Sequence, residues 1–82
     1  MVYKLERERD GFLFIGDKFA SIKHKEEGNE ATQWPPKVGE STITYNDIYD
    51  YWQTTLVTKI LSLKENVCKF ETENNVYTLT KN

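Results

Sequence analysis

Two pairs of side chains in this sequence are of types that carry acid–base or nucleophilic chemistry. Asp47 and Asp50 lie three positions apart, but a catalytic carboxylate pair needs a pocket in which one pKa is raised. In a polar segment, paired Asp residues are more often caps and solvated surface groups. His24 and Cys68 are the only residues of their types and lie 44 positions apart. Cys68 belongs to an apolar run, which favours a buried and inert thiol over a nucleophile.

No other motif for catalysis or ligand binding occurs. The sequence has no nucleophile elbow, no glycine-rich phosphate loop, no His-x-x-x-His pair and no calcium-binding loop. A single cysteine forms neither an internal disulfide nor a cysteine-rich metal site. We therefore predict that the protein is not an enzyme and that it uses no cofactor and no metal.

The most distinctive local feature is a segment that combines aromatic and acidic residues and lacks basic ones. No Lys or Arg occurs between Lys37 and Lys59. Tyr and Trp provide large contact areas at low entropic cost, and carboxylates attract a basic partner. We therefore predict a surface that binds a partner protein. Its residues are Trp34, Tyr45, Asp47, Tyr49, Asp50 and Tyr51.

Each of these rings also has an ordinary structural explanation. Tyr51 and Trp52 would belong to the core, while Tyr45 and Tyr49 would be half-exposed residues without a partner. Trp34 is the only aromatic residue of a long loop, so it either pins that loop to the body of the protein or anchors a ligand. We favour the pinning role for Trp34.

Length and composition exclude several classes of protein. The chain of 82 residues makes one domain, residues 1–82, and its core must be small because only 38% of the residues are apolar. The formal net charge of −2 is spread over both halves, which argues against nucleic acid as a partner. No apolar stretch is long enough to span a bilayer or to act as a signal peptide. We expect a soluble, cytoplasmic protein that does not contact membranes.

The first half of the chain is predicted to form short strands and one long loop. Residues 2–6 alternate between apolar and polar, and Asp10-Gly11 separates them from the apolar run 12–15. This pattern predicts a tight hairpin with both turn residues at positive φ, and the alternative is a helix over residues 2–9. Residues 19–24 predict a short strand. Residues 25–40 are predicted to be the longest loop because prolines and a glycine interrupt them.

The second half has a stronger pattern. Residues 41–45 predict a strand, and Asn46 would cap a short helical turn near residues 46–51. Five β-branched residues within 54–60 favour a strand near 53–63 over the alternative, a long helix over 46–63. Residues 67–72 and 76–80 complete a three-stranded antiparallel meander. The predicted fold class is mainly β: a small antiparallel sheet or an SH3-like, partly open barrel, with this C-terminal meander and one short helical turn.

Residues 52–79 resemble a signature of many short bacterial and phage proteins. Residues 52–60 follow Trp-x-Thr-Ser/Thr-x-Val-x-x-Ile, and residues 72–79 follow Thr-x-Asn-Ser/Thr-x-Tyr-x-Leu. Asn75 stands where the family usually has a small hydroxyl residue. The family has no assigned activity, so the resemblance implies no particular chemistry. The same pattern is also typical of a stable hairpin, because Thr side chains suit a pleated surface.

These observations favour a non-enzymatic, small protein-binding module. A phage or mobile-element modulator or inhibitor of a host protein is one form of it, with a host or cellular partner that carries basic charge. The alternative is a small β-barrel that binds single-stranded nucleic acid by stacking bases on Trp34, Phe12 and Phe14, although the acidic balance counts against it. A homo-oligomer formed through an exposed edge strand of the meander is a further alternative.

Overall fold

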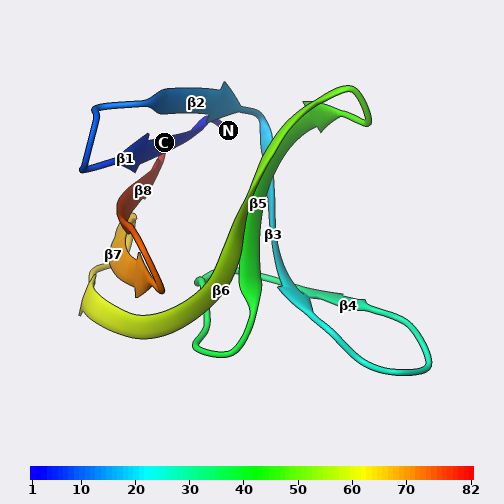
Figure 1. The fold of residues 1–82 in the computed structure, drawn as a ribbon. Helices are drawn as coiled ribbons and strands as arrows, with labels where there is room; N and C mark the ends of the chain where they lie inside the picture. The colour runs from blue at the N-terminus through cyan, green and yellow to red at the C-terminus, as the bar shows by residue number, and fades with distance from the viewer.

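The computed structural model describes residues 1–82 and consists of eight strands joined by turns and loops. The strands form one antiparallel sheet in the order β2-β1-β8-β7-β6-β5-β3-β4 (Figure 1). The mainly β prediction is thus confirmed, and the sheet is open because its edge strands do not pair with each other. No helix that could span a membrane is present. The strands are β1 Tyr3–Arg7, β2 Leu13–Gly16, β3 Lys18–Lys23, β4 Glu30–Thr32, β5 Ser41–Asp47, β6 Asp50–Leu63, β7 Val67–Thr72 and β8 Val76–Lys81.

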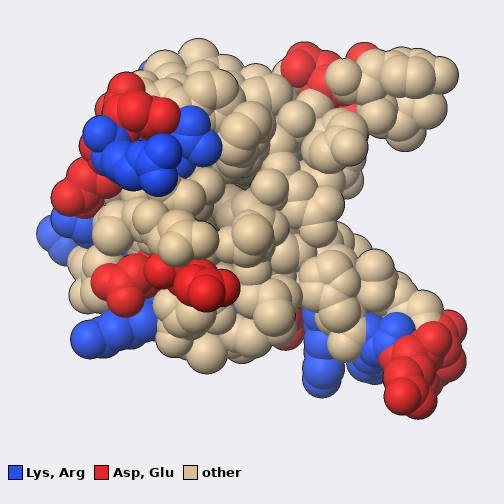
Figure 2. All heavy atoms as spheres, viewed as in Figure 1, with Lys and Arg blue, Asp and Glu red and all other residues tan.

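The sheet curves strongly because its longest strand is bent. β6 pairs with β5 through residues 50–56 and with β7 through residues 57–63. Its register with β7 shifts twice, between Val57 and Lys59 and between Ile60 and Ser62. Such bulges bend a strand and increase its twist. Two hairpins, β3–β4 and β5–β6, project from the curved body as separate arms (Figure 1, Figure 2).

The predicted hairpin around Asp10-Gly11 is confirmed, and the alternative helix over residues 2–9 is wrong. The turn is longer than predicted, because the Arg7 N–H donates to the Phe12 carbonyl and the Gly11 N–H donates to the Arg7 carbonyl. Of the two turn residues predicted to have positive φ, Asp10 and Gly11, only Gly11 has one, of 71°. Asp10 instead accepts hydrogen bonds from the Arg7 guanidinium at 2.8 and 3.0 Å and from the Phe12 N–H at 3.1 Å. These bonds lower the pKa of Asp10 to about 2, and the bond from Arg7 has the largest effect.

The predicted loop over residues 25–40 contains one strand that the sequence pattern does not reveal. β4 has only three residues and pairs with the end of β3, so it is too short to show a periodicity. Polar side chains hold the rest of this segment against the body. The Glu40 carboxylate accepts hydrogen bonds from the hydroxyls of Ser21 at 2.7 Å and Thr32 at 2.9 Å.

The helical turn predicted near residues 46–51 is wrong, and so is the alternative long helix over 46–63. These residues form a tight turn between β5 and β6, in which Asp47 pairs with Asp50. The Asp47 carboxylate accepts hydrogen bonds from the N–H groups of Tyr49 at 2.8 Å and Asp50 at 3.0 Å. A carboxylate that can cap a helix thus closes a hairpin instead, because the β-branched residues that follow extend as a strand. The strand predicted near 53–63 is confirmed and begins earlier, at Asp50.

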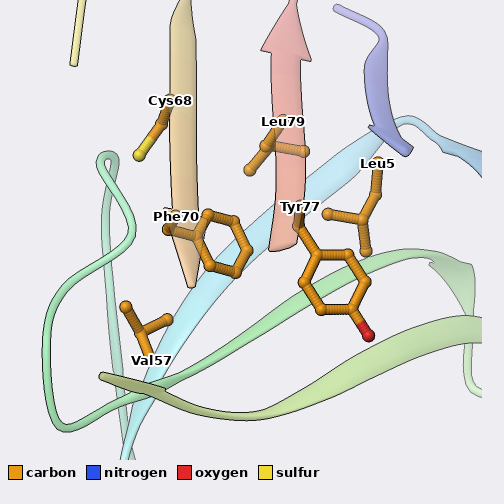
Figure 3. Packing of buried hydrophobic residues seen from close by; sticks show 6 residues of the cluster. All are labelled: Leu5, Val57, Cys68, Phe70, Tyr77 and Leu79. Carbon is orange, nitrogen blue, oxygen red and sulfur yellow. The ribbon is translucent and has the colours of Figure 1, made fainter. Parts of the chain in front are cut away.

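The core is small and lies under the meander. It consists of Leu5, Val57, Cys68, Phe70, Tyr77 and Leu79 (Figure 3). The rings of Phe70 and Tyr77 stack with their centroids 5.5 Å apart. The meander predicted over residues 53–80 is confirmed and supplies five of these six side chains. β1 closes the core from the side of β8, and the chain ends meet there, since Val2 and Asn82 exchange two backbone hydrogen bonds of 3.0 and 2.9 Å.

Candidate functional site

Five of the six residues predicted to bind a partner lie on the β5–β6 arm. They are Tyr45, Asp47, Tyr49, Asp50 and Tyr51. The sixth residue, Trp34, lies against the body of the protein. The structure therefore assembles most of the predicted surface on one arm and leaves one residue apart from it.

Trp34 belongs to a second aromatic cluster, which consists of Tyr3, Phe19 and Trp34 and lies apart from the stacked rings of the core. Its ring centroid lies 5.5 Å from that of Phe19 and 6.5 Å from that of Tyr3, and the Lys81 amine lies 4.5 Å from it. Successive residues of a strand point to opposite faces, so Ala20 points away from this cluster and towards the outer face of β3. The contacts of Trp34 are those of a residue that pins the loop over residues 25–40 to the body.

A hollow of about 640 Å³ lies between the two arms, on the outer face of β3 to β6 (Figure 2). Its wall is mainly apolar, and three of the predicted residues, Tyr45, Asp47 and Tyr51, belong to it. The Lys18 amine lies 5.9 Å from the centroid of the Tyr45 ring at one end. The apolar lining residues are Ala20, Ile22, Ala31, Ile43, Tyr45, Ile48 and Tyr51.

The apolar wall arises from an inverted pattern on β5. Thr42 and Thr44 are fully buried, so the alternating residues Ile43 and Tyr45 point to the outer face. In an ordinary half-buried strand the large apolar side chains face the core. Sequence reasoning missed Ile43 for that reason, although its alternation with two Thr residues was the available signal.

This inversion costs stability, because the Thr42 and Thr44 hydroxyls are buried without a hydrogen-bond partner. Leaving a buried polar group unpaired costs about 1–3 kcal/mol. We expect Thr44→Val, which keeps the side-chain shape, to raise the free energy of unfolding by about 1 kcal/mol. Urea unfolding followed by tryptophan fluorescence measures the change, with the exposed Thr55→Val as the control. A loss of stability in Thr44→Val would contradict the unpaired hydroxyl.

The tip of the β5–β6 arm is apolar and acidic. Ile48 and Tyr49 are 78% and 89% exposed. No basic side chain forms an ion pair with Asp47 or Asp50. The Asp50 carboxylate only accepts a hydrogen bond from the Asn46 side chain, at 2.8 Å. The tip therefore presents two apolar side chains and two uncompensated negative charges to the solvent.

Asn46 sets the position of this arm relative to β2. Its side-chain oxygen accepts a hydrogen bond from the Asp17 N–H at 2.9 Å, and its side-chain nitrogen donates to the Ile15 carbonyl at 3.1 Å. These bonds tie the end of β5 to the junction of β2 and β3. Asn46, predicted as a helix cap, acts here as a bridge between strands that are not paired.

The residues with potential for nucleophilic chemistry are held in structural contacts. His24 Nε2 lies 3.0 Å from Ser41 Oγ, which also accepts a hydrogen bond from the Gln53 amide at 2.9 Å. Ser41 is buried at the start of β5. Cys68 is fully buried in the core, and burial raises the pKa of its thiol. No group of three or more His, Cys, Asp or Glu side chains gathers in an arrangement that could hold a metal ion.

Two of the three rings of the nucleic-acid alternative, Phe12 and Trp34, already pack within the protein. The Phe12 ring lies 4.4 Å from the Trp52 ring between centroids, and the Arg7 guanidinium lies 5.0 and 5.4 Å from these two rings. Trp34 is engaged with the second aromatic cluster described above. Base stacking at these positions would have to displace existing contacts.

Comparison with known proteins does not assign the chain to a family or a function. No family model, no curated protein and no solved structure matches the chain. The hollow and the tip of the arm beside it are the features of the structure that bear on function.

Proposed function

We propose that the protein is a non-enzymatic protein-binding module. The hollow between the arms holds an apolar segment of a partner, and the acidic tip attracts basic charge on that partner. The observation that carries this proposal is the inverted pattern of β5, which places Ile43 and Tyr45 outside and unpaired hydroxyls inside. A pattern that lowers stability without a structural gain is typical of a functional surface.

The composition of the hollow suits recognition of another protein. Tyr51 is 52% exposed and lies in the wall beside the half-exposed Tyr45. Aromatic residues at the centre of an interface contribute much of its binding energy. Asp47 and Asp50, at the rim, would mainly increase the rate of association and the selectivity for a basic partner.

The proposal also includes the biological setting in which the protein acts. The resemblance of residues 52–79 to short bacterial and phage proteins supports a phage or mobile-element modulator that acts on a host or cellular protein in the cytoplasm. We also propose that the curved sheet is a partly open barrel of the SH3-like kind. Two features support this: a single residue separates β2 from β3, and β6 is bent. Asn46 bridges the end of β5 to the junction of β2 and β3, so β5 and β2 lie close together although they are not paired.

Selection from a random peptide library tests the proposal without knowledge of the partner. We expect the enriched peptides to combine a large apolar residue with Lys or Arg. Tyr51→Ser should weaken binding of a selected peptide by about tenfold or more, because an aromatic anchor of the hollow is lost. Fluorescence anisotropy with the labelled peptide measures the dissociation constant.

Leu63→Ser is the matched control, since Leu63 lies on the same strand, is 51% exposed and does not line the hollow. Peptides that bind wild type, Tyr51→Ser and Leu63→Ser equally would place binding outside the hollow. A labelled oligothymidine measured at low salt serves as a second probe. Binding of this probe that is lost in Phe12→Ala would favour the nucleic-acid alternative instead.

A further inference from the structure

We propose that two copies of this chain can exchange their N-terminal hairpins, β1 and β2, and thereby form a dimer. In this dimer the hairpin of each copy pairs with β8 of the other copy, and the bend at Asp17 opens into a continuous strand. The partner is a second copy because the surface to be filled is the one that the hairpin of this chain already fills. The exchange requires no occupant of the hollow.

The hairpin is joined to the rest of the sheet through a single strand interface. β1 and β2 pair with each other, and β1 also pairs with β8. β2 lies at the edge of the sheet and pairs with no other strand. The covalent connection to β3 is one residue, Asp17. The hairpin can therefore leave its own chain as a unit when its pairing with β8 is broken and the chain straightens at Asp17.

The bend between β2 and β3 can open without a change of backbone region. Figure 1 shows the chain changing direction sharply between these strands. Neither Gly16 nor Asp17 has a positive φ, so the bend and an extended strand share the same half of φ space. The straightened strand would span residues 13–23 and carry the hairpin away from β8 of its own chain. Short hinges of this kind favour exchange between copies.

Asn46 is the residue that holds the bend closed. Its side-chain oxygen accepts a hydrogen bond from the Asp17 N–H at 2.9 Å, and its side-chain nitrogen donates to the Ile15 carbonyl at 3.1 Å. In the exchanged dimer the hairpin of the second copy supplies the same carbonyl at the same place. The bond to Asp17 depends on the bend and is lost. One hydrogen bond contributes modestly to stability, so the two forms differ little in the contacts of the hinge.

The surface that the hairpin vacates matches the hairpin itself. Leu5 and its cross-strand partner Leu79 are both fully buried in the core. The Phe12 ring of the hairpin lies 4.4 Å from the Trp52 ring between centroids. Detachment exposes all of these side chains and the free edge of β8, which is costly and slow. The hairpin of a second copy restores each contact, so the dimer keeps the core of the monomer.

Disulfide cross-linking between β1 and β8 tests the exchange directly. Glu6 and Thr78 are cross-strand partners, and each flanks a buried residue, so both side chains point to the outer face. Their Cα atoms are expected about 4.5–5.5 Å apart, within reach of a disulfide. The single variants E6C and T78C are refolded together from urea at high protein concentration under reducing conditions and then oxidised. Cys68 stays in both variants because it is buried.

We expect a cross-linked product of twice the chain mass of 9.7 kDa on a non-reducing gel. The two new thiols belong to different chains and meet only when a hairpin has changed chains. A mixture of E6C and K69C is the matched control. Lys69 pairs with Thr78 on the side of that residue away from β1, so it lies on the same face but two strands from Glu6. This mixture should give no such product.

Asn46→Ala tests the residue that holds the bend closed. The variant should lower the dissociation constant of the dimer by about tenfold, because two closed chains lose the bond to Asp17 and the exchanged dimer has none to lose. Sedimentation velocity over a concentration series of refolded protein measures this constant. Asn29→Ala is the control, since Asn29 is exposed in the turn at the other end of β3 and should leave the constant unchanged. Far-ultraviolet circular dichroism verifies that the sheet is retained.

Two outcomes would overturn the exchange. One is a refolded mixture that contains only the 9.7 kDa species at every concentration. The other is a dimer in which E6C and T78C cross-link no better than E6C and K69C, which would mean that the copies associate through their surfaces. Equal dissociation constants for wild type and Asn46→Ala would contradict the role of Asn46. If that variant does not fold, the cross-linking of E6C with T78C still decides whether hairpins are exchanged.

Discussion

Phe70→Ala should lower the free energy of unfolding by about 3–5 kcal/mol, the cost typical of truncating a large buried ring. Phe70 is fully buried and is one of only six side chains in the core. Its ring also stacks on Tyr77, so truncation leaves a cavity beside a second aromatic residue. A domain of this size has only about 5–15 kcal/mol of stability in total. The variant should therefore be marginally stable, with its unfolding midpoint shifted far towards low urea.

Urea unfolding followed by circular dichroism measures this change. Leu13→Ala is the control, because Leu13 lies half-exposed on the edge strand β2 and truncating it should cost no more than about 0.5 kcal/mol. Equal losses in the two variants would contradict a core that lies under the meander.

Gly16→Ala should lower the free energy of unfolding by about 1–3 kcal/mol, although it adds a single carbon. A Cβ at this position would lie 2.9 Å from the backbone nitrogen of Tyr45 and 3.0 Å from its carbonyl oxygen. Backbone atoms cannot rotate away as a flexible side chain can, so β2 and β5 would have to separate. That movement would stretch the Asn46 bonds to Ile15 and Asp17. Gly16→Val should cost more than Gly16→Ala.

The same substitution should affect the hollow, because Tyr45 forms part of its wall. We therefore expect Gly16→Ala to weaken peptide binding as well as stability. Asp17→Ala is the neighbouring control, since its side chain is exposed and pairs only with Lys18. Wild-type stability in both Gly16→Ala and Gly16→Val would show that β2 and β5 separate without cost.

Local periodicity predicts the paired strands of this fold well. The β-branched run in residues 54–60 identifies β6, and Asp10-Gly11 identifies the first hairpin, because each rests on a preference of a few neighbouring residues. The turn at Asn46 and Asp47 was predicted as helical since the same side chains cap helices and close hairpins. Only the pairing of β5 with β6 decides between these outcomes.

The candidate site was predictable only in part. The absence of basic residues and the abundance of Tyr mark the β5–β6 arm in the sequence. Ile43 alternates with Thr42 and Thr44, but this alternation does not tell which of the two faces of the strand lies outward. Which face of a strand becomes the interior depends on the curvature of the whole sheet. Proximity in sequence groups Trp34 with the arm, whereas its packing on Phe19 places it elsewhere.

The hydrogen bonds between Val2 and Asn82 have a consequence for the connectivity of the chain. Because the two ends lie side by side in one sheet, a short linker could join them and make the backbone a closed ring. New ends could then be opened in the exposed turn around Gly28, at the end of the β3–β4 arm and away from the core. The order in which the strands are synthesised would change, but every strand would keep its neighbours. The pairing of the strands therefore does not depend on where in this closed ring the backbone is opened.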